Sequence, residues 1–230
     1  MNDALDKLSA RLAYWFRDVA LLERAITHSS FAQDQPGTES NQRLEFLGDS
    51  VLQLVLTEAL FQLFPTEREG PLSTRRAALA NGTFLAQLAR EIGLDACLRL
   101  SASDDALGTR LRTSALGDAF EALIGAVFLD SDFATARRVL LAIYGPLPAR
   151  LALVEDASNP KGRLQEIVQP VHGNDALRYE VTRTEGADHQ REYEVAVFLC
   201  DRQLGTGRGS SKKLAEEAAA REALETLKTS

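Results

Sequence analysis

Residues 41–50 read Asn41-Gln42-Arg43-Leu44-Glu45-Phe46-Leu47-Gly48-Asp49-Ser50 and open a long segment with an apolar helical period. Glu45 and Asp49 are four residues apart, so a helix places both carboxylates on one face, one turn apart. Apolar residues surround the pair and favour its partial burial: Leu44, Phe46, Leu47, Val51 and Leu52. Two like charges repel at this spacing, and burial raises the cost unless a cation lies between them.

A second pair of carboxylates interrupts the nearly all-apolar segment 116–126. Asp118 and Glu121 are three residues apart and share a face of the predicted helix. Acidic side chains in a buried helix are rarely without a partner. Two helices that each carry such a pair supply four carboxylates, an all-oxygen cage of the kind that binds Mg²⁺ or Mn²⁺.

Two other interpretations account for the same spacing. An acidic pair on a helix is more often a solvated face than a metal site, and Arg43, Arg75 or Arg76 can pair with these carboxylates. Both pairs fall in the two most apolar predicted helices, which favours a metal. The spacing alone nevertheless leaves metal binding and ion pairing open.

The sequence around these segments predicts an all-α domain over residues 1–153. A long apolar-periodic run extends from Gln42 to Phe64 and stops at Pro65, and strand-like alternation is nearly absent. Ser73 has the position of an N-cap for a helix through Ala80. Other helices are expected at 8–16, 19–26, 83–92, 114–129 and 132–144.

The final third of the chain has a different pattern. Helical segments at 159–171 and 210–227 enclose three segments that alternate apolar and polar residues, at 179–185, 192–200 and 202–207. The predicted order is therefore α-β-β-β-α, a second domain over residues 159–228 of the α+β class. The short polar segment 154–158 is the expected linker.

The composition and the charge of the chain indicate which kinds of partner to expect. The chain has 230 residues, of which 45% are hydrophobic, enough to build the cores of two domains. A net charge of −7 argues against a nucleic-acid partner when only the total is considered. The placement of charge favours one, because Arg208, Lys212 and Lys213 lie at the predicted start of the last helix, where free N–H groups attract phosphate.

Several kinds of protein are not expected from this sequence. Cys97 and Cys200 are the two cysteines and are far apart, and there are three histidines, so neither a disulfide scaffold nor a zinc site is expected. The chain has no secretory signal pattern at residues 1–7 and no run of about 20 apolar residues. We expect a soluble, cytoplasmic protein that does not enter a membrane.

The decapeptide 41–50 resembles the signature of the ribonuclease III family, N-E-R-L-E-F-L-G-D-S, at nine of its ten positions. Residues 117–130 resemble the second catalytic helix of that family. Residues 27–30 (Thr-His-Ser-Ser) and 64–70 resemble further motifs of that family. The resemblance covers essentially the whole chain.

This resemblance implies an endoribonuclease that depends on Mg²⁺, with Mn²⁺ as a substitute, and cleaves double-stranded RNA to 5′-phosphates with short 3′ overhangs. It implies rRNA and mRNA precursors as substrates. Glu45, Asp49, Asp118 and Glu121 correspond to the metal-binding carboxylates, with Asp49 and Glu121 catalytic. Glu69 corresponds to a further acidic residue that lines the catalytic valley from the partner subunit, although a glutamate exposed in a loop also fits its spacing.

The resemblance further implies a homodimer in which each subunit cuts one strand. Phe46 then packs into the partner subunit. The competing interpretation of Phe46 is a place in the core of its own chain.

One position departs from the family pattern. Gln42 replaces the usual glutamate, and an amide carries no negative charge, so it is not an equivalent metal ligand. This change favours an alternative function, a non-cleaving double-stranded RNA-binding or chaperone protein whose nuclease domain has become a dimerisation scaffold. The four retained carboxylates favour the enzyme.

Residues 159–228 resemble a double-stranded RNA-binding domain, although Gly162 stands where a threonine is customary. A rigid module of this kind reads the shape of the RNA minor groove across about 16 bp. The implied RNA-binding residues lie in the first helix, in the loop after the first strand and at the start of the last helix: Gln165, Glu166, His189, Arg208, Ser211, Lys212 and Lys213.

Overall fold

The computed structural model of the protein describes residues 3–158, 160–173, 176–186 and 191–228. Contacts between residues divide the chain into two compact units, with the division between Leu151 and Ala152. Residues 154–158, the expected linker, form the end of a helix that begins at Leu147.

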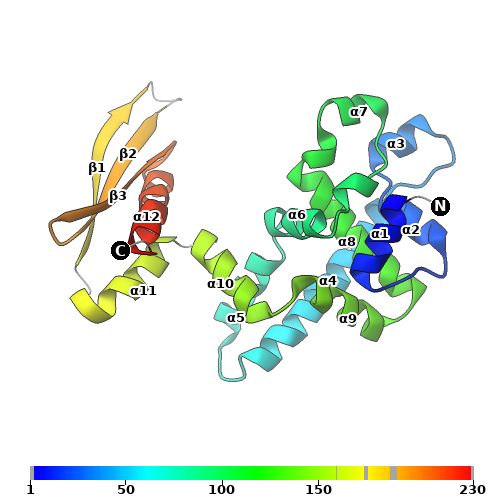
Figure 1. Ribbon diagram of the computed structural model, residues 1–230, viewed down its shortest axis with the longest axis horizontal. Coiled ribbons are helices and arrows are strands. Elements are labelled where there is room, and N and C mark those ends of the chain that lie inside the picture. The colour runs from blue at the N-terminus through cyan, green and yellow to red at the C-terminus, as the bar shows by residue number, and fades with distance from the viewer. Residues whose placement is uncertain (1–2, 159, 174–175, 187–190, 229–230) are drawn as a thin grey trace. The chain divides into compact units, whose positions relative to one another are not determined.

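The first unit is built from helices, as the sequence predicts (Figure 1). Two 3₁₀ turns, η1 (Asp95–Cys97) and η2 (Thr109–Leu111), connect helices in its second half. The helices are α1 (Asp3–Leu12), α2 (Val19–Ala25), α3 (Ser29–Asp34), α4 (Gln42–Leu63), α5 (Glu69–Leu79), α6 (Gly82–Glu91), α7 (Ala102–Ala106), α8 (Thr113–Asp130) and α9 (Phe133–Tyr144), and the division between the units falls within α10 (Leu147–Ser158).

Helix α8 is the centre of this unit. It packs against α2, α4, α6 and α9, with its most extensive contact to α4. Its side chains are apolar on nearly every face, which is typical of a helix enclosed by others. The fully buried ones include Leu116, Phe120, Leu123, Ile124 and Val127.

Two glycines let the backbones of α4 and α8 touch. A Cβ atom on Gly48 of α4 would lie 1.8 Å from the carbonyl oxygen of Glu121. A Cβ atom on Gly125 of α8 would lie 2.3 Å from the carbonyl oxygen of Leu44. Any larger residue therefore forces the two helices apart, since backbone atoms cannot rotate away as a side chain can.

A buried carboxylate fixes the C-terminal end of α8. The Asp130 side chain accepts hydrogen bonds from the Tyr14 hydroxyl (2.6 Å) and from the backbone N–H groups of Arg17 (2.8 Å) and Asp18 (2.9 Å). Burial acts against the charge of Asp130, but these hydrogen bonds together lower the pKa of its carboxyl. The segment that precedes α2 is thereby attached to the central helix.

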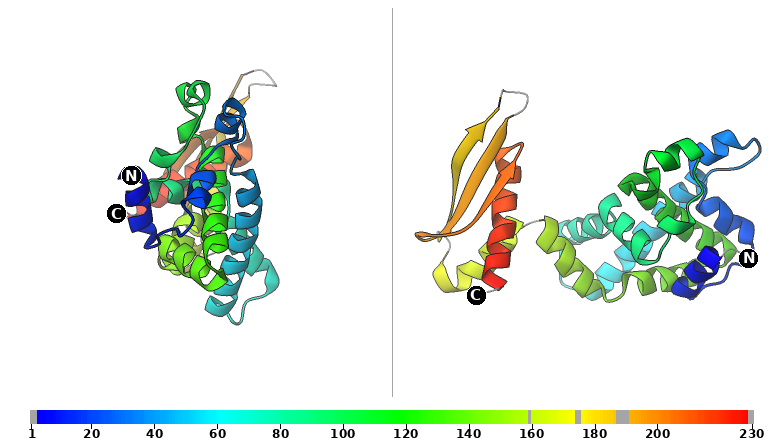
Figure 2. Two further views of the ribbon diagram at one scale, coloured as in Figure 1. Left: turned by 90° about the vertical axis from the view of Figure 1, so that its right-hand side faces the viewer. Right: turned by 45° about the horizontal axis from the view of Figure 1, so that its top comes forward.

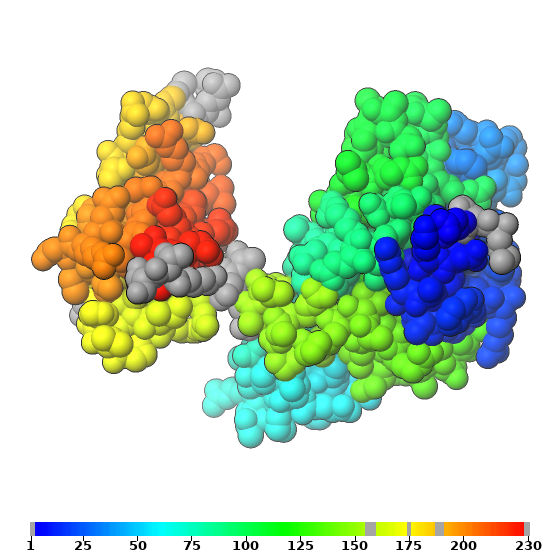
Figure 3. Space-filling model, viewed as in Figure 1, coloured from blue at the N-terminus to red at the C-terminus, as the bar shows by residue number. Residues whose placement is uncertain are grey.

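Helix α1 lies on the surface of the first unit (Figure 3) and contacts α9 and η1. Its buried residues include Leu8 and Leu12. The predicted first helix extends to Phe16, whereas α1 ends at Leu12 because Ala13 adopts a left-handed conformation with a φ of 48°. Trp15 is consequently outside the helix and exposed.

The predicted start of α5 is wrong. The helix begins at Glu69, one turn before Ser73, which was expected to be its N-cap. Pro71 lies in the first turn, where a missing N–H costs no helical hydrogen bond. The hydroxyl of Ser73 instead donates to Glu69 Oε1 at 2.9 Å.

The second unit confirms the α-β-β-β-α order. Its elements are α11 (Pro160–His172), β1 (Leu177–Glu185), β2 (Glu192–Leu199), β3 (Arg202–Gly209) and α12 (Lys212–Lys228). The strands form an antiparallel sheet in the order β1-β2-β3. Both helices lie on one face of the sheet (Figures 1 and 2), and their apolar side chains form a core with that face, including Leu164, Val168, Val195, Val197 and Leu224.

The close approach of α4 and α8 predicts a selective sensitivity to added methyl groups. Gly48→Ala and Gly125→Ala are each expected to lower the free energy of unfolding by at least about 2–3 kcal/mol, because the new Cβ meets backbone. Gly117→Ala is the matched control on α8, since the nearest neighbour of its Cβ would be the carbonyl oxygen of Gly82 at 3.4 Å, an ordinary van der Waals distance.

Urea denaturation of the three variants measures the difference. The control is expected to be neutral or slightly stabilising, because alanine favours a helix over glycine by about 1 kcal/mol. Equal stability of G48A, G125A and G117A would contradict the backbone contact.

Candidate active site

The four predicted metal-binding carboxylates are positioned by the crossing of α4 and α8. Gly48 lies between Glu45 and Asp49 on α4, and the backbone carbonyl of Glu121 is its nearest neighbour on α8. Asp118 is one turn before Glu121 on the same helix. All four residues are partly exposed, at the rim of an otherwise buried contact.

The electrostatics of the four groups show that the structure brings them together. Burial and the negative charges of Asp49, Glu45 and Asp118 raise the pKa of Glu121 to about 7. Burial, Asp118 and Asp49 likewise raise the pKa of Glu45. Neighbouring carboxylates thus disfavour the ionisation of Glu45 and Glu121, as expected for like charges in one partly desolvated site.

Two of the arginines that were alternative partners of these carboxylates, Arg75 and Arg76, contact other residues. Arg75 pairs with Glu67 and lies over the ring of Phe64, with the guanidinium carbon 4.1 Å from the ring centre. Arg76 donates to the hydroxyl of Thr57 at 3.0 Å. His28 interacts with one member of the carboxylate cluster: it opposes the effect of burial on the pKa of Asp118.

The donor set fits a divalent metal ion. Among the residues that the structure describes, no three Asp, Glu, His or Cys side chains stand close enough together to hold an ion as they are placed. The four carboxylates are nevertheless electrostatically coupled, and all of their ligand atoms are oxygen, which Mg²⁺ and Mn²⁺ prefer. A dication among them would offset the repulsion that raises the pKa values of Glu45 and Glu121.

Two neighbouring residues were not singled out from the sequence as parts of this site. The Gln53 amide, one turn after Asp49 on α4, donates to Asp49 Oδ1 at 3.2 Å. His28 lies in the segment that precedes α3 and interacts with Asp118 on α8. Gln53 could have been found from the sequence, because it follows Asp49 by four residues and so lies on the same helix face. His28 could not, because it is 90 residues from Asp118 in sequence.

Gln42 and Glu69 lie outside the cluster. Gln42 is the first residue of α4, is exposed, and accepts a hydrogen bond from the Ser40 hydroxyl at 3.3 Å. Glu69 begins α5 and lines a groove of about 450 Å³ with Thr57 and Phe61 of α4. Thr57 is eight residues beyond Asp49, or about 12 Å along the helix, so Glu69 does not join the other four carboxylates within its own subunit.

Phe46 is not a core residue of its own chain. Its side chain is 80% exposed, although it follows Glu45 directly on α4. The interpretation of Phe46 as part of an intrachain core is therefore wrong, and its ring is accessible to another molecule.

In the second unit, the start of α12 has the predicted basic character. Lys212 and Lys213 occupy its first turn and are exposed, and Lys213 Nζ lies 4.0 Å from Glu217. Ser211 caps the helix, because its hydroxyl accepts the backbone N–H of Leu214 at 3.3 Å. Ser211 thus has a structural role at the position where an RNA contact was predicted.

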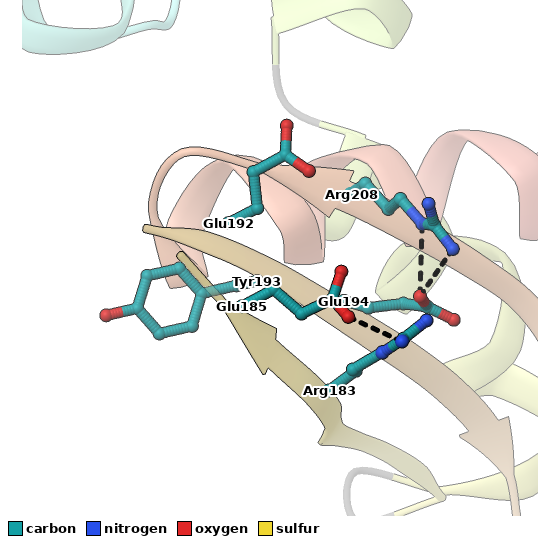
Figure 4. Close-up of a pocket in the computed structure, with 6 residues that line it drawn as sticks. All are labelled: Arg183, Glu185, Glu192, Tyr193, Glu194 and Arg208. Atoms are coloured by element: carbon teal, nitrogen blue, oxygen red, sulfur yellow. Dashed lines mark hydrogen bonds and ion pairs between the residues drawn. The ribbon is translucent and has the colours of Figure 1, made fainter. Parts of the chain in front are cut away.

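Arg208 is separated from the two lysines by the sheet. Gly205, Gly207 and Gly209 face α12, where a Cβ on Gly207 would lie 2.1 Å from the backbone nitrogen of Ala219. Residues alternate between the faces of a strand, so Arg208 points to the opposite face. There it donates to Glu194 from Nε at 3.0 Å (Figure 4).

The remaining predicted RNA contacts lie on α11 or outside the described residues. Gln165 is half-buried, and Glu166 is exposed and pairs with Arg163 at 3.2 Å. Lys161 at the start of α11 was not predicted as a site residue and pairs with Glu216 of α12 at 2.5 Å. His189 lies outside the residues that the structure describes.

Comparison with known proteins agrees with this geometry. A family model described as Ribonuclease-III-like matches residues 18–146, and one described as a double-stranded RNA binding motif matches residues 160–227. A protein named Ribonuclease 3 from Bdellovibrio bacteriovorus is 42% identical, over 95% of this chain and 94% of its own.

The chain belongs to the ribonuclease III family.

Other members of the ribonuclease III family show the same correspondence. Ribonuclease 3 from Pseudomonas aeruginosa is 43% identical over 99% of this chain and 97% of its own. A solved nuclease domain of ribonuclease III from Campylobacter jejuni is 40% identical, with a TM-score of 0.58, and covers 60% of this chain and 94% of that one. Within the described residues of this ribonuclease III chain, no helix has the length and apolar character needed to cross a membrane.

The pKa of Glu121 predicts how pH affects the stability of this ribonuclease III. The carboxyl stays protonated up to about pH 7 in the folded protein but ionises near its ordinary value of 4.5 in the unfolded chain. Its contribution to stability is therefore lost as the pH rises from about 4.5 through 7. Glu121→Gln is expected to stabilise the protein at pH 8 by on the order of 1–2 kcal/mol, after allowance for solvent screening, and to have little effect at pH 4.5.

Thermal unfolding of E121Q and the wild type in the presence of a chelator measures this difference. Glu58→Gln is the control, because it neutralises a carboxylate on α4 that is paired with Arg137. A stabilisation by E121Q that is the same at both pH values would refute the raised pKa.

Proposed function

We propose that this chain is a Mg²⁺-dependent endoribonuclease, with Mn²⁺ as a substitute, that hydrolyses double-stranded RNA to 5′-phosphate products with short 3′ overhangs. The observation that carries the proposal is the convergence of two carboxylate pairs at the crossing of α4 and α8. The same chain carries a double-stranded RNA binding motif. We assign residues 1–153 to the nuclease, 154–158 to a connection and 159–228 to RNA binding, and we place the activity in the cytoplasm, on rRNA and mRNA precursors.

The chain's own residues divide the work at the site. Glu45, Asp49, Asp118 and Glu121 would hold the divalent ion, and Asp49 would also orient the attacking water. When bound, the ion supplies positive charge that lowers the pKa of that water and stabilises charge on the scissile phosphate. Gln53 holds the carboxylate of Asp49 through its hydrogen bond, which limits the orientations open to that group.

A raised pKa suits Glu121 to this role. Its carboxylate is costly to ionise among three other acids, and a bound divalent cation would compensate that charge and favour the ionised form of Glu121 near neutral pH. Glu69, at the start of α5, lies outside this cluster and would reach the valley of the partner subunit rather than its own.

Gln42 supports the second candidate function, a non-cleaving RNA-binding scaffold. The residue lies at the first position of α4 and is exposed, one turn before Glu45. Its amide removes one negative charge from the edge of the site but leaves the four coupled carboxylates in place. The retained cluster is the reason to favour cleavage.

We assign duplex RNA binding mainly to the start of α12. Lys212 and Lys213 add two exposed positive charges to the free N–H groups of a 17-residue helix. The other RNA contacts would come from the two helices, the segment between β1 and β2, and β3: Gln165, Glu166, His189, Arg208 and Ser211. Arg208 contributes less, because Glu194 already neutralises its charge.

We assign homodimerisation to the exposed apolar face of α4. Phe46, Leu54 and Phe61 are 80%, 56% and 69% exposed and fall on one face of the helix, at intervals of eight and seven residues. A two-fold axis at Leu54 would place Phe46 of one subunit opposite Phe61 of the other. The groove beside Phe61, which is lined by Thr57, Leu60 and Leu72 among others, would receive the Phe46 ring of the other subunit.

Cleavage of a generic RNA duplex tests the function. The wild type is expected to cleave with Mg²⁺ and not with a chelator, and Glu121→Ala is expected to lose cleavage while still binding the duplex. Glu58→Ala is the matched control, because it removes a carboxylate from α4 that pairs with Arg137 instead of facing the cluster. Binding without Mg²⁺-dependent cleavage by the wild type would support the scaffold instead.

Salt dependence tests the RNA-binding surface. The double substitution Lys212→Ala and Lys213→Ala is expected to weaken duplex binding and to reduce the slope of log K against log salt by about one unit per lysine. Arg208→Ala is the comparison, with a smaller expected change because its charge is paired with Glu194. An unchanged slope in the double variant would rule out this surface.

Sedimentation velocity tests the dimer. Phe46→Ala is expected to shift the protein to monomers, because it removes the ring that fills the partner's groove. Leu107→Ala is the control, since Leu107 is 70% exposed but lies after α7 and away from the proposed interface. A dimer of unchanged affinity in F46A would refute the role of Phe46.

A further inference from the structure

The ring of His28 is held on one side by its own helix cap. His28 is the N-cap of α3, and its Nδ1 atom accepts the backbone N–H of Ser30 at 3.2 Å. The Ser30 hydroxyl lies 2.9 Å from the same nitrogen. Because a backbone N–H can only donate, Nδ1 is an acceptor.

A third group fixes the direction of the serine contact. The backbone N–H of Ser101 donates to Ser30 Oγ at 3.2 Å, so the hydroxyl proton of Ser30 is free to be donated to His28 Nδ1. With Nδ1 accepting, the neutral imidazole carries its proton on Nε2. The ring therefore presents one N–H donor on the side away from α3.

The backbone of His28 is also held in place relative to α4. Its N–H donates to the carbonyl of Arg99 at 3.0 Å, and the carbonyl of the preceding Thr27 accepts the N–H of Asn41 at 2.8 Å. Asn41 is the residue before α4, and its own carbonyl accepts the N–H of Glu45 at 2.9 Å. The ring is thus carried by a segment that is attached to the first turn of the helix that bears the active-site acids.

The second ring nitrogen, Nε2, is not used by the cap of α3. Within the described part of the chain, Nε2 has no hydrogen-bond partner, and the ring interacts favourably with Asp118. A polar contact longer than a direct hydrogen bond is commonly bridged by one water. Carboxylates that bind metals are usually held by such outer donors, whose loss weakens metal binding by about 10–100-fold.

We propose that His28 is a positioning residue for Asp118: its Nε2–H donates toward the carboxylate, directly or through one water, and holds it for the divalent ion. The proposal rests on the metal-dependent function proposed above. It gives His28 two separable roles, a cap for α3 through Nδ1 and an outer support for the metal site through Nε2.

Two amide substitutions separate these roles. His28→Asn places an acceptor oxygen near the position of Nδ1 and retains the cap, but it does not reach the position of Nε2. His28→Gln places its amide nitrogen near the position of Nε2 and loses the cap. Binding of Mn²⁺ to the full-length protein without RNA, followed by electron paramagnetic resonance, and the melting temperature are measured for both variants.

H28N is expected to melt as the wild type does and to bind Mn²⁺ at least about tenfold more weakly. H28Q is expected to melt at a lower temperature because it loses the cap. At temperatures where it is folded, it is expected to bind Mn²⁺ within about threefold of the wild type, because its amide nitrogen replaces Nε2. Wild-type Mn²⁺ affinity in H28N would overturn the positioning role while leaving the proposed function intact. A wild-type protein that binds no Mn²⁺ would overturn the metal-dependent function and the role of His28 with it.

Discussion

The contact between the backbones of α4 and α8 is the constraint on which the nuclease unit depends. Gly48 and Gly125 bring the helices so close that carbonyl oxygens occupy the space of the missing Cβ atoms. Two acidic pairs on separate helices become one site only at such a distance. Each acidic pair alone fits a solvent-exposed helix face. The crossing brings the two pairs together as four coupled carboxylates and raises the pKa of Glu121 to about 7.

Much of this arrangement could be predicted from the sequence. The bounds expected for α4 and α8 agree with the structure to within one residue, because both helices are long and strongly apolar. The order of elements in the second unit followed from its alternating segments. The short helices α3 and α7 were missed, since six and five residues are too few to show a helical period.

Contacts between distant segments could not be predicted from local patterns. Ser101 supports the cap of α3 from 71 residues away, and the spacing of residues carries no sign of that hydrogen bond. The separation of Arg208 from Lys212 and Lys213 is another case. The three residues lie within residues 208–213, but the glycines of β3 face α12, and Arg208 therefore points to the opposite face of the strand. The total charge of −7 was a poor guide for the same reason, because a basic residue in an ion pair and an exposed basic residue each add one positive charge to it.

Helix α4 has a consequence for the geometry of the product. In the proposed dimer, the two-fold axis passes near Leu54, six residues from the crossing at Gly48, and an antiparallel pair of helices repeats that interval on the other side. Two active sites are then offset by about 18 Å along the shared helix direction. In such a dimer, the rigid helix would set the distance between the two cuts, because each turn changes the offset by a fixed amount. The number of residues between Gly48 and Leu54 would accordingly determine the length of the RNA overhang, and no loop would contribute to it.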